Sequence, residues 1–73
     1  MSRNRITKLI ARRVSAAIAA AGADVSNVAR AADITILELH ERLNGRVEFA
    51  YGELVDVGGF LRVPANRFLG GAA

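Results

Sequence analysis

The chain has 73 residues, 52% of them hydrophobic, so it is too short for more than one domain and too apolar for a disordered protein. It contains no cysteine, which excludes a disulfide framework and thiolate zinc sites, and its longest apolar run, Ala16 to Ala23, is far shorter than the roughly twenty residues of a membrane span. The formal net charge is +3, with five of the ten Lys and Arg residues placed before the first acidic residue, Asp24.

These early positive charges are Arg3, Arg5, Lys8, Arg12 and Arg13. Residues 1–5 precede any helical pattern, so we expect a flexible basic arm. If the chain binds DNA, Arg3 and Arg5 would follow its backbone or enter a minor groove. Such a cluster attracts phosphate. It would equally serve as a solvated surface on an alanine-rich protein.

A first helix is predicted from Ile6 to Ala21. Its apolar residues recur at the spacing of one helix face: Ile6, Leu9, Ile10, Val14, Ala17, Ile18 and Ala21. Gly22 should end the helix, because glycine readily adopts the left-handed conformation that closes one.

A second helix is predicted from Val25 to about Ala32. Asp24 directly before it is a preferred N-cap residue, whose carboxylate can accept from the first backbone N–H groups. Asp33, Ile34 and Thr35 then form a tight turn.

A third helix should begin directly after Thr35. Glu38 follows three residues later, and this pair is the signature of a capping box, which fixes where a helix starts. Asn44 and Gly45 should end it. Four apolar residues fall where two helices crossing at a steep angle would bury them: Ala29, Ile34, Leu39 and Leu43.

The rest of the chain predicts two more helices. The fourth helix is marked by Tyr51, Leu54, Val55, Val57, Phe60 and Leu61. Phe49, in the loop before this helix, should pack into the core. Gly58 and Gly59 interrupt this helix, each at a cost of up to about 1 kcal/mol relative to alanine. Pro64 suits the first turn of a short fifth helix. We therefore expect an all-α fold, a compact bundle of about five short helices in one domain over residues 6–69, with a frayed tail at 70–73.

The third helix carries the most specific motif. Its Leu39-His40-Glu41-Arg42-Leu43-Asn44-Gly45-Arg46 segment is similar to the Leu-His-Arg-Arg-Leu-x-Gly-Arg run of short regulators of actinobacterial phages and their hosts. The chain resembles the lambda-repressor-like, Cro/repressor-type helix-turn-helix family without gaps over residues 25–45. A looser match continues through Phe49, Glu53, Leu54, Leu61, Val63 and Leu69. The resemblance implies that residues 25–45 are a helix-turn-helix whose second helix enters the DNA major groove.

Three features depart from that family. Asp33 stands where the turn usually has glycine. Val25 stands where the family often has a glutamine that holds a phosphate, which leaves only the backbone N–H for that contact. The recognition helix opens with Ile36 and Leu37 rather than with polar residues.

The resemblance assigns the candidate DNA contacts. The residues expected to contact bases are Ile36, Leu37, His40 and Glu41, with Ile36 and Leu37 packing on thymine methyl groups. The residues expected to contact the backbone are Arg46, Asn44, Arg42, Ser26, Val25, Arg12 and Arg13. Two alternatives stay open: Ile36 or Leu37 could pack into the core or against a partner protein, and Arg42 could pair with Glu38.

The C-terminal region has two interpretations. Phe60, Phe68 and Leu69 occupy the region through which members of this family usually form dimers. The same residues could instead close the small core over the first helix.

From these features we expect a sequence-specific regulator of phage or prophage origin that occupies double-stranded operator DNA, alone or as a homodimer, in the bacterial cytoplasm at the nucleoid. No nucleophile–base pair or ligand cluster is evident, so we expect no enzymatic activity, cofactor, metal, small-molecule substrate or membrane partner. The alternatives are an antitoxin or adaptor that binds a protein through Ile36 and Leu37, and an excisionase-like architectural DNA-binding protein.

Overall fold

Five helices account for most of residues 3–70, the part of the chain that the computed structural model describes. They are α1 (Arg3–Ala21), α2 (Val25–Ala31), α3 (Ile36–Leu43), α4 (Tyr51–Leu61) and α5 (Ala65–Leu69). The predicted all-α fold class is confirmed. Within this range, none of the helices combines the length and the apolar character needed to cross a membrane.

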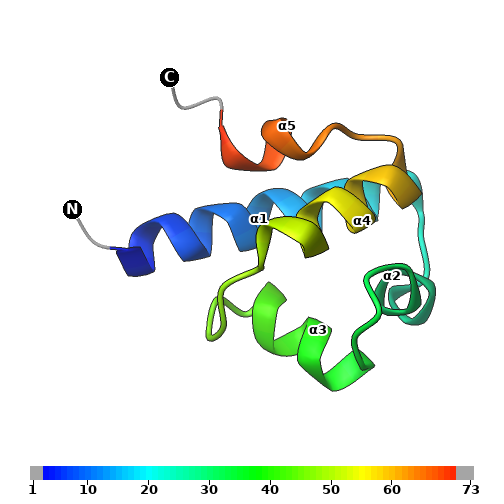
Figure 1. The fold of residues 1–73 in the computed structure, drawn as a ribbon, viewed down its shortest axis with the longest axis horizontal. Coiled ribbons are helices and arrows are strands. Elements are labelled where there is room, and N and C mark those ends of the chain that lie inside the picture. The colour runs from blue at the N-terminus through cyan, green and yellow to red at the C-terminus, as the bar shows by residue number, and fades with distance from the viewer. Residues whose placement is uncertain (1–2, 71–73) are drawn as a thin grey trace.

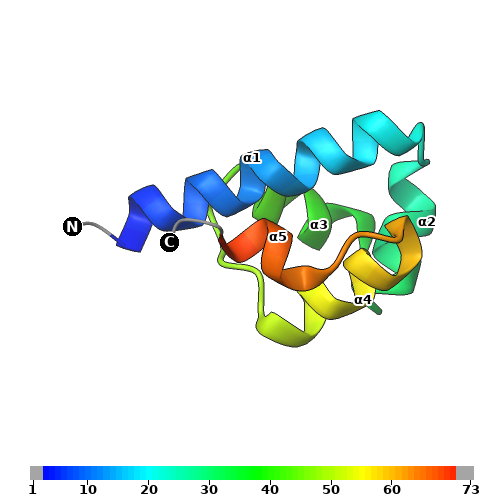
Figure 2. The same ribbon diagram turned by 90° about the horizontal axis from the view of Figure 1, so that it is seen from above.

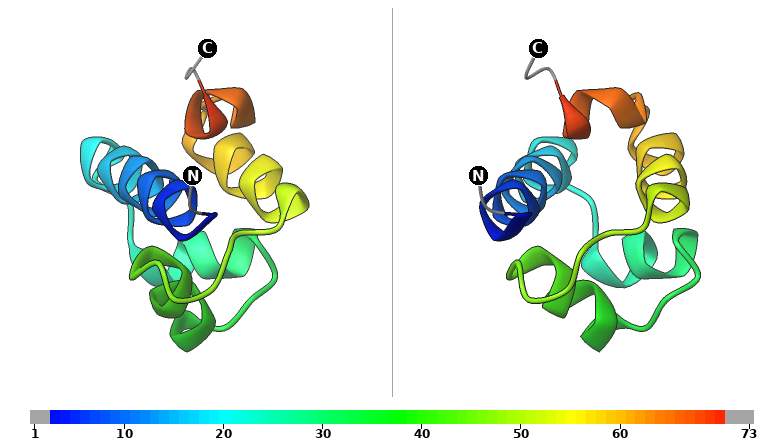
Figure 3. Two further views of the ribbon diagram at one scale, coloured as in Figure 1. Left: turned by 90° about the vertical axis from the view of Figure 1, so that its left-hand side faces the viewer. Right: turned by 60° about the vertical axis from the view of Figure 1, so that its left-hand side comes forward.

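The long helix α1 organises the other four. Helix α5 lies on one side of it and α3 on the opposite side (Figure 1). Helix α4 forms the second flank of the molecule, facing α1 (Figure 3), and α2 lies at the far end, where α1 finishes (Figure 2). Helices α3 and α5 therefore face solvent on opposite sides of the molecule.

Helix α1 starts earlier than the apolar pattern indicated. It begins at Arg3 rather than Ile6, so the part of the predicted basic arm from Arg3 to Arg5 is helical. Arginine has a high helix propensity, and nothing before Ile6 breaks a helix. One turn later Thr7 is buried, and its hydroxyl donates to Glu48 Oε2 at 3.4 Å, which anchors this end. Residues 1–2 of the arm and 71–73 of the predicted tail lie outside the described residues.

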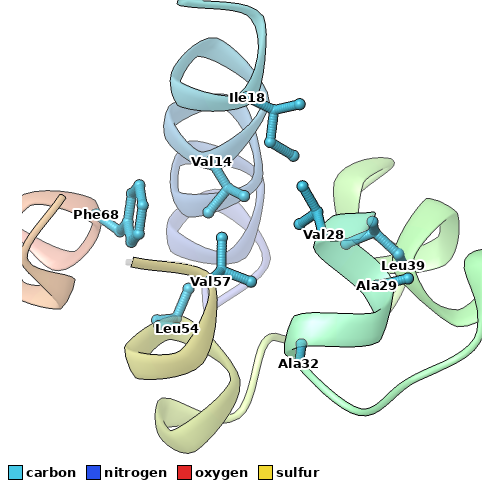
Figure 4. Packing of buried hydrophobic residues seen from close by; sticks show 9 residues of the cluster. All are labelled: Val14, Ile18, Val28, Ala29, Ala32, Leu39, Leu54, Val57 and Phe68. Atoms are coloured by element: carbon cyan, nitrogen blue, oxygen red, sulfur yellow. The ribbon is translucent and has the colours of Figure 1, made fainter. Parts of the chain in front are cut away.

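The core receives side chains from all five helices (Figure 4). Its largest fully buried residues are Val14, Val28, Leu39, Leu54, Val57 and Phe68. Burial of one such side chain stabilises the fold by roughly 1.5–3 kcal/mol relative to leaving it in water. Phe49 packs against this cluster from the α3–α4 loop, as predicted.

Three glycines of the chain differ in why the fold has a glycine at their position. Gly22 has φ +62°, which confirms that it closes α1. A Cβ on Gly58 would overlap the carbonyl oxygen of Val63, so the chain can fold back from α4 to α5 only because this position has no side chain. Gly59 has open space where a Cβ would be, so nothing within the chain requires a glycine there.

Candidate functional site

The turn between α2 and α3 forms as predicted. Asp33 adopts φ 59°, the left-handed conformation that aspartate tolerates better than most side chains. The N–H of Ile34 donates to Ala29 O at 3.0 Å and turns the chain away from α2. Asp33 therefore supplies the left-handed residue that this turn needs.

The capping box fixes the start of α3. Thr35 Oγ1 accepts from the Glu38 N–H at 3.0 Å, and Glu38 Oε1 accepts from the Thr35 N–H at 2.9 Å. Glu38 thus has the capping role that the sequence predicted. Its carboxylate also partly offsets the positive end of the helix dipole.

Helix α3 has one buried side and one exposed side. Leu39 is completely buried, whereas Ile36 is 47% and Leu37 70% exposed, and His40 is exposed as well. Ile36 and Leu37 therefore do not pack into the core, which was one of the alternatives for them. Glu41, the fourth predicted base contact, is half-buried.

Basic and polar groups gather at the opposite end of α3. A groove between α1 and this end is lined by Lys8, Arg12 and Ser15 from α1 and by Asn44 after α3, with Leu43 and three alanines of α1 completing it. Arg46 follows Asn44 by two residues and is exposed. The structure thus brings Arg12 and Asn44 to one groove, with Arg46 two residues further along the chain and the exposed first turn of α3 at the other end of the same helix.

Lys8 belongs to this group, although the sequence assigned it no contact. Gly45 has φ +79°, and a Cβ on it would lie 2.8 Å from Lys8 Cγ, so α1 and the end of α3 approach closely here. The spacing of Lys8 and Arg12, four residues apart on one helix face, was the available signal. This spacing could have predicted a role for Lys8 only if the face of α1 that packs against α3 had been known.

Arg13 makes hydrogen bonds within the fold that would compete with the phosphate contact predicted for it. Its Nη1 donates to Phe68 O at 3.1 Å and to Gly70 O at 3.0 Å. Arg13 follows Arg12 by one residue and so lies about 100° further round α1. It holds the end of α5, on the side of the molecule away from α3.

Arg42 is also engaged within the fold. Its Nε donates to Glu53 Oε1 at 2.8 Å and its Nη2 to Glu53 Oε2 at 3.3 Å, and both side chains are largely buried. The hydrogen bond with Glu53 raises the pKa of Arg42. The predicted pairing with the Glu38 carboxylate is wrong, because Arg42 reaches only the backbone oxygen of that residue, at 3.1 Å. The phosphate contact predicted for Arg42 stays a prediction, and the hydrogen bonds to Glu53 and to the Glu38 backbone would compete with it.

The start of α2 already holds a negative charge. The Asp24 carboxylate accepts from both the N–H and the hydroxyl of Ser26, each at 3.0 Å. The backbone hydrogen bond, followed by that from the hydroxyl, lowers the pKa of Asp24. Ser26 is therefore already paired with a carboxylate, which would repel a phosphate. The phosphate contact predicted for the Val25 N–H stays a prediction, and the Val25 side chain packs against the core.

The three candidate dimer residues separate into two groups. Phe68 is 1% exposed and closes the core over α1, so a dimer contact by this residue is wrong. Phe60 and Leu69 remain 45% and 40% exposed.

Among residues 3–70, no three His, Asp or Glu side chains come together in a way that could hold a metal ion. Comparison of the chain with protein-family models, with curated proteins and with solved structures finds no match.

Proposed function

We propose that the chain is a sequence-specific DNA-binding regulator of the Cro/repressor type, whose helix α3 enters the major groove of a duplex. One observation carries this proposal. The exposed side of α3 begins with side chains suited to base edges and ends among cationic side chains from α1 and the α3–α4 loop. This distribution matches how a recognition helix divides base contacts from phosphate contacts.

The dimensions and chemistry of α3 suit the groove. Eight residues make a helix of about 12 Å, short enough for its exposed side to follow base edges over a few base pairs. Ile36 and Leu37 would pack on thymine methyl groups, and His40 on the same side would donate to a base or a phosphate. Apolar contacts of this kind favour thymine over cytosine at the positions they touch.

The cationic group would position the helix. Lys8, Arg12 and Arg46 are exposed, and Asn44 lies among them. Each cation that meets a phosphate releases condensed counterions, so binding should weaken steeply as salt rises. The net charge of +3 supports the same long-range attraction.

One observation favours a second candidate, a protein-binding module. Leu37 is 70% exposed, more than any other large apolar side chain in the described residues, and Glu38 and Glu41 on the same helix disfavour phosphate. A partner protein could cover Leu37 together with Ile36, as an antitoxin or adaptor would require. Such a complex would depend only weakly on salt.

Salt-dependent binding to duplex DNA separates the two candidates. Fluorescence anisotropy of a labelled duplex should show binding at low salt, with log K falling against log salt at a slope of about −3 to −4 for three or four phosphate contacts. Arg46→Ala should reduce the slope by about one unit. Arg67→Ala is the matched control, since it removes an exposed charge from α5 on the side opposite α3, and it should leave the slope unchanged. No binding at low salt up to about 100 µM, the weak end of non-specific affinity, would contradict the proposal.

A further inference from the structure

Helix α3 carries one carboxylate that the fold itself does not use. Glu38 is held in the capping box at the start of the helix, where its Oε1 accepts from the Thr35 N–H. The Glu41 carboxylate, in contrast, forms no hydrogen bond or ion pair with any other group of residues 3–70. On a helix that enters DNA such a group is repelled by the phosphates, so it favours binding only where a base amine donates to it.

Glu41 lies in the middle of the outward side of α3, directly beside Leu37. At about 100° per residue, the two positions differ by about 40° around the helix, and each is about 160° from the buried Leu39. Residues four apart on a helix are neighbours, so an apolar side chain that is 70% exposed stands next to the carboxylate. The backbone of Glu41 is also fixed, because its oxygen accepts from the N–H groups of Arg46 and Val47 at 3.0 and 3.4 Å. The two side chains can therefore contact a single base.

The bases differ in what they offer to a carboxylate beside an apolar side chain. In the major groove cytosine presents its N4 amine, a donor, next to ring position C5. Adenine also presents an amine, but the neighbouring N7 is an acceptor, which repels a carboxylate. Thymine carries a methyl group at C5 but has the acceptor O4 in place of the amine, and guanine presents only acceptors. The base that offers both an amine and an adjacent methyl group is cytosine methylated at C5.

We propose that Leu37 and Glu41 together recognise 5-methylcytosine, so that the duplex bound most tightly by this chain is methylated. Glu41 accepts from the N4 amine, and Leu37 packs on the methyl group beside it. The neighbouring pair, Ile36 and His40, differs in one respect, since an imidazole N–H donates to the O4 of thymine while Ile36 covers the methyl group. This inference rests on the proposed function and names the chemical form of its DNA substrate.

Matched duplexes test the recognition of 5-methylcytosine. A binding sequence is first selected from a randomised duplex pool in which every cytosine is 5-methylcytosine. Fluorescence anisotropy then compares duplexes that carry 5-methylcytosine, cytosine or thymine at one position of that sequence at a time. At one position, 5-methylcytosine should bind about fourfold more tightly than cytosine, which is the value of one buried methyl group. It should bind about tenfold more tightly than thymine, because O4 would leave the Glu41 carboxylate facing an acceptor.

Two variants separate the two parts of this recognition. Leu37→Ala should bind the methylated and unmethylated duplexes equally and still prefer cytosine to thymine. Glu41→Gln should keep the gain from the methyl group but lose the preference for 5-methylcytosine over thymine, because an amide can also donate to O4. Asp56→Asn, which neutralises an exposed carboxylate on α4, is the control and should keep both preferences.

The outcomes distinguish this inference from the proposed function. A chain that binds duplex DNA but does not distinguish 5-methylcytosine from cytosine at any position would overturn the inference alone. A preference for 5-methylcytosine that survives in Leu37→Ala would overturn it as well. Absence of binding to every duplex of the pool would contradict the proposed function itself, and the inference with it.

Discussion

Arg42 at the end of α3 and Glu53 in the first turn of α4 form a two-pronged ion pair, 2.8 Å from Nε to Oε1 and 3.3 Å from Nη2 to Oε2. Glu53 Oε1 also accepts from the Ala50 N–H at 3.0 Å, so one carboxylate closes the start of α4 and holds the end of α3. The orientation of α3 is thus fixed by a contact on the side of the helix away from the proposed DNA surface.

Glu53→Gln should lower the free energy of unfolding by about 1–2 kcal/mol, because the charged partner of Arg42 is lost. Chemical denaturation measures this, with Asp56→Asn, an exposed carboxylate on the same helix, as the control. An effect no larger than that of the control would mean that the pair contributes little.

Acid should weaken the same contact in the native chain. Burial raises the pKa of Glu53, but the hydrogen bonds from Arg42 and Ala50 outweigh it, and the net shift is downward. A carboxylate with a lowered folded-state pKa stabilises the fold above its unfolded pKa, and this stability is lost as pH falls through the folded value. Unfolding free energy should therefore fall on acidification below about pH 4.5, and Glu53→Gln should show a smaller fall. Equal pH dependence in both would contradict this role of Glu53.

Arg12→Ala and Arg13→Ala should differ although the residues are adjacent. Arg12→Ala should lower the salt slope of duplex binding by about one unit and leave stability nearly unchanged, because Arg12 is exposed beside the end of α3. Arg13→Ala should leave the slope unchanged and lower the melting temperature, because it removes the hydrogen bonds to Phe68 and Gly70. Anisotropy and thermal denaturation of the two variants decide this, and equal slopes would place Arg12 outside the DNA contact.

Thymine methyl groups should contribute to binding where Ile36 and Leu37 touch them. Replacing a contacted thymine by uracil should cost about 1 kcal/mol or less per methyl. Ile36→Ala should erase that difference and leave the circular dichroism spectrum unchanged, since the side chain is 47% exposed. An operator insensitive to uracil at every position would assign these residues to a protein partner instead.

Gly58→Ala and Gly59→Ala should change stability in opposite directions. The first should destabilise the fold by roughly 1–3 kcal/mol, because the added methyl overlaps a backbone oxygen that cannot move without shifting the α4–α5 connection. The second should stabilise it by up to about 1 kcal/mol, because its Cβ meets open space. Denaturation at concentrations low enough for the monomer measures both, and destabilisation by Gly59→Ala would reveal a contact that the fold does not show.

Local signals in the sequence were sufficient for most helix boundaries. Asp24, Thr35 with Glu38, and Gly45 act on neighbouring backbone groups, so their roles follow from residue type and spacing alone. The start of α1 was misplaced because its polar first turn carries no apolar periodicity.

The candidate site was harder to predict because it depends on contacts between helices. Nothing in the spacing distinguishes Arg12 from Arg13, yet one lies beside α3 and the other holds α5. Arg42 has two acids within one turn of its own helix and pairs instead with Glu53, eleven residues away. Lys8 enters the site only because α1 packs against Gly45.

Amide chemical-shift mapping of the 15N-labelled chain during titration with a short duplex would locate the DNA-binding surface residue by residue. We expect the largest changes on residues 35–41, on Lys8 and Arg12, and on residues 44–46. Amides of α5 and of the outer side of α4 should change little under conditions where the chain is monomeric. Changes centred on α5 or spread evenly over the chain would contradict the proposal that α3 and the cationic group beside it form the DNA-binding surface.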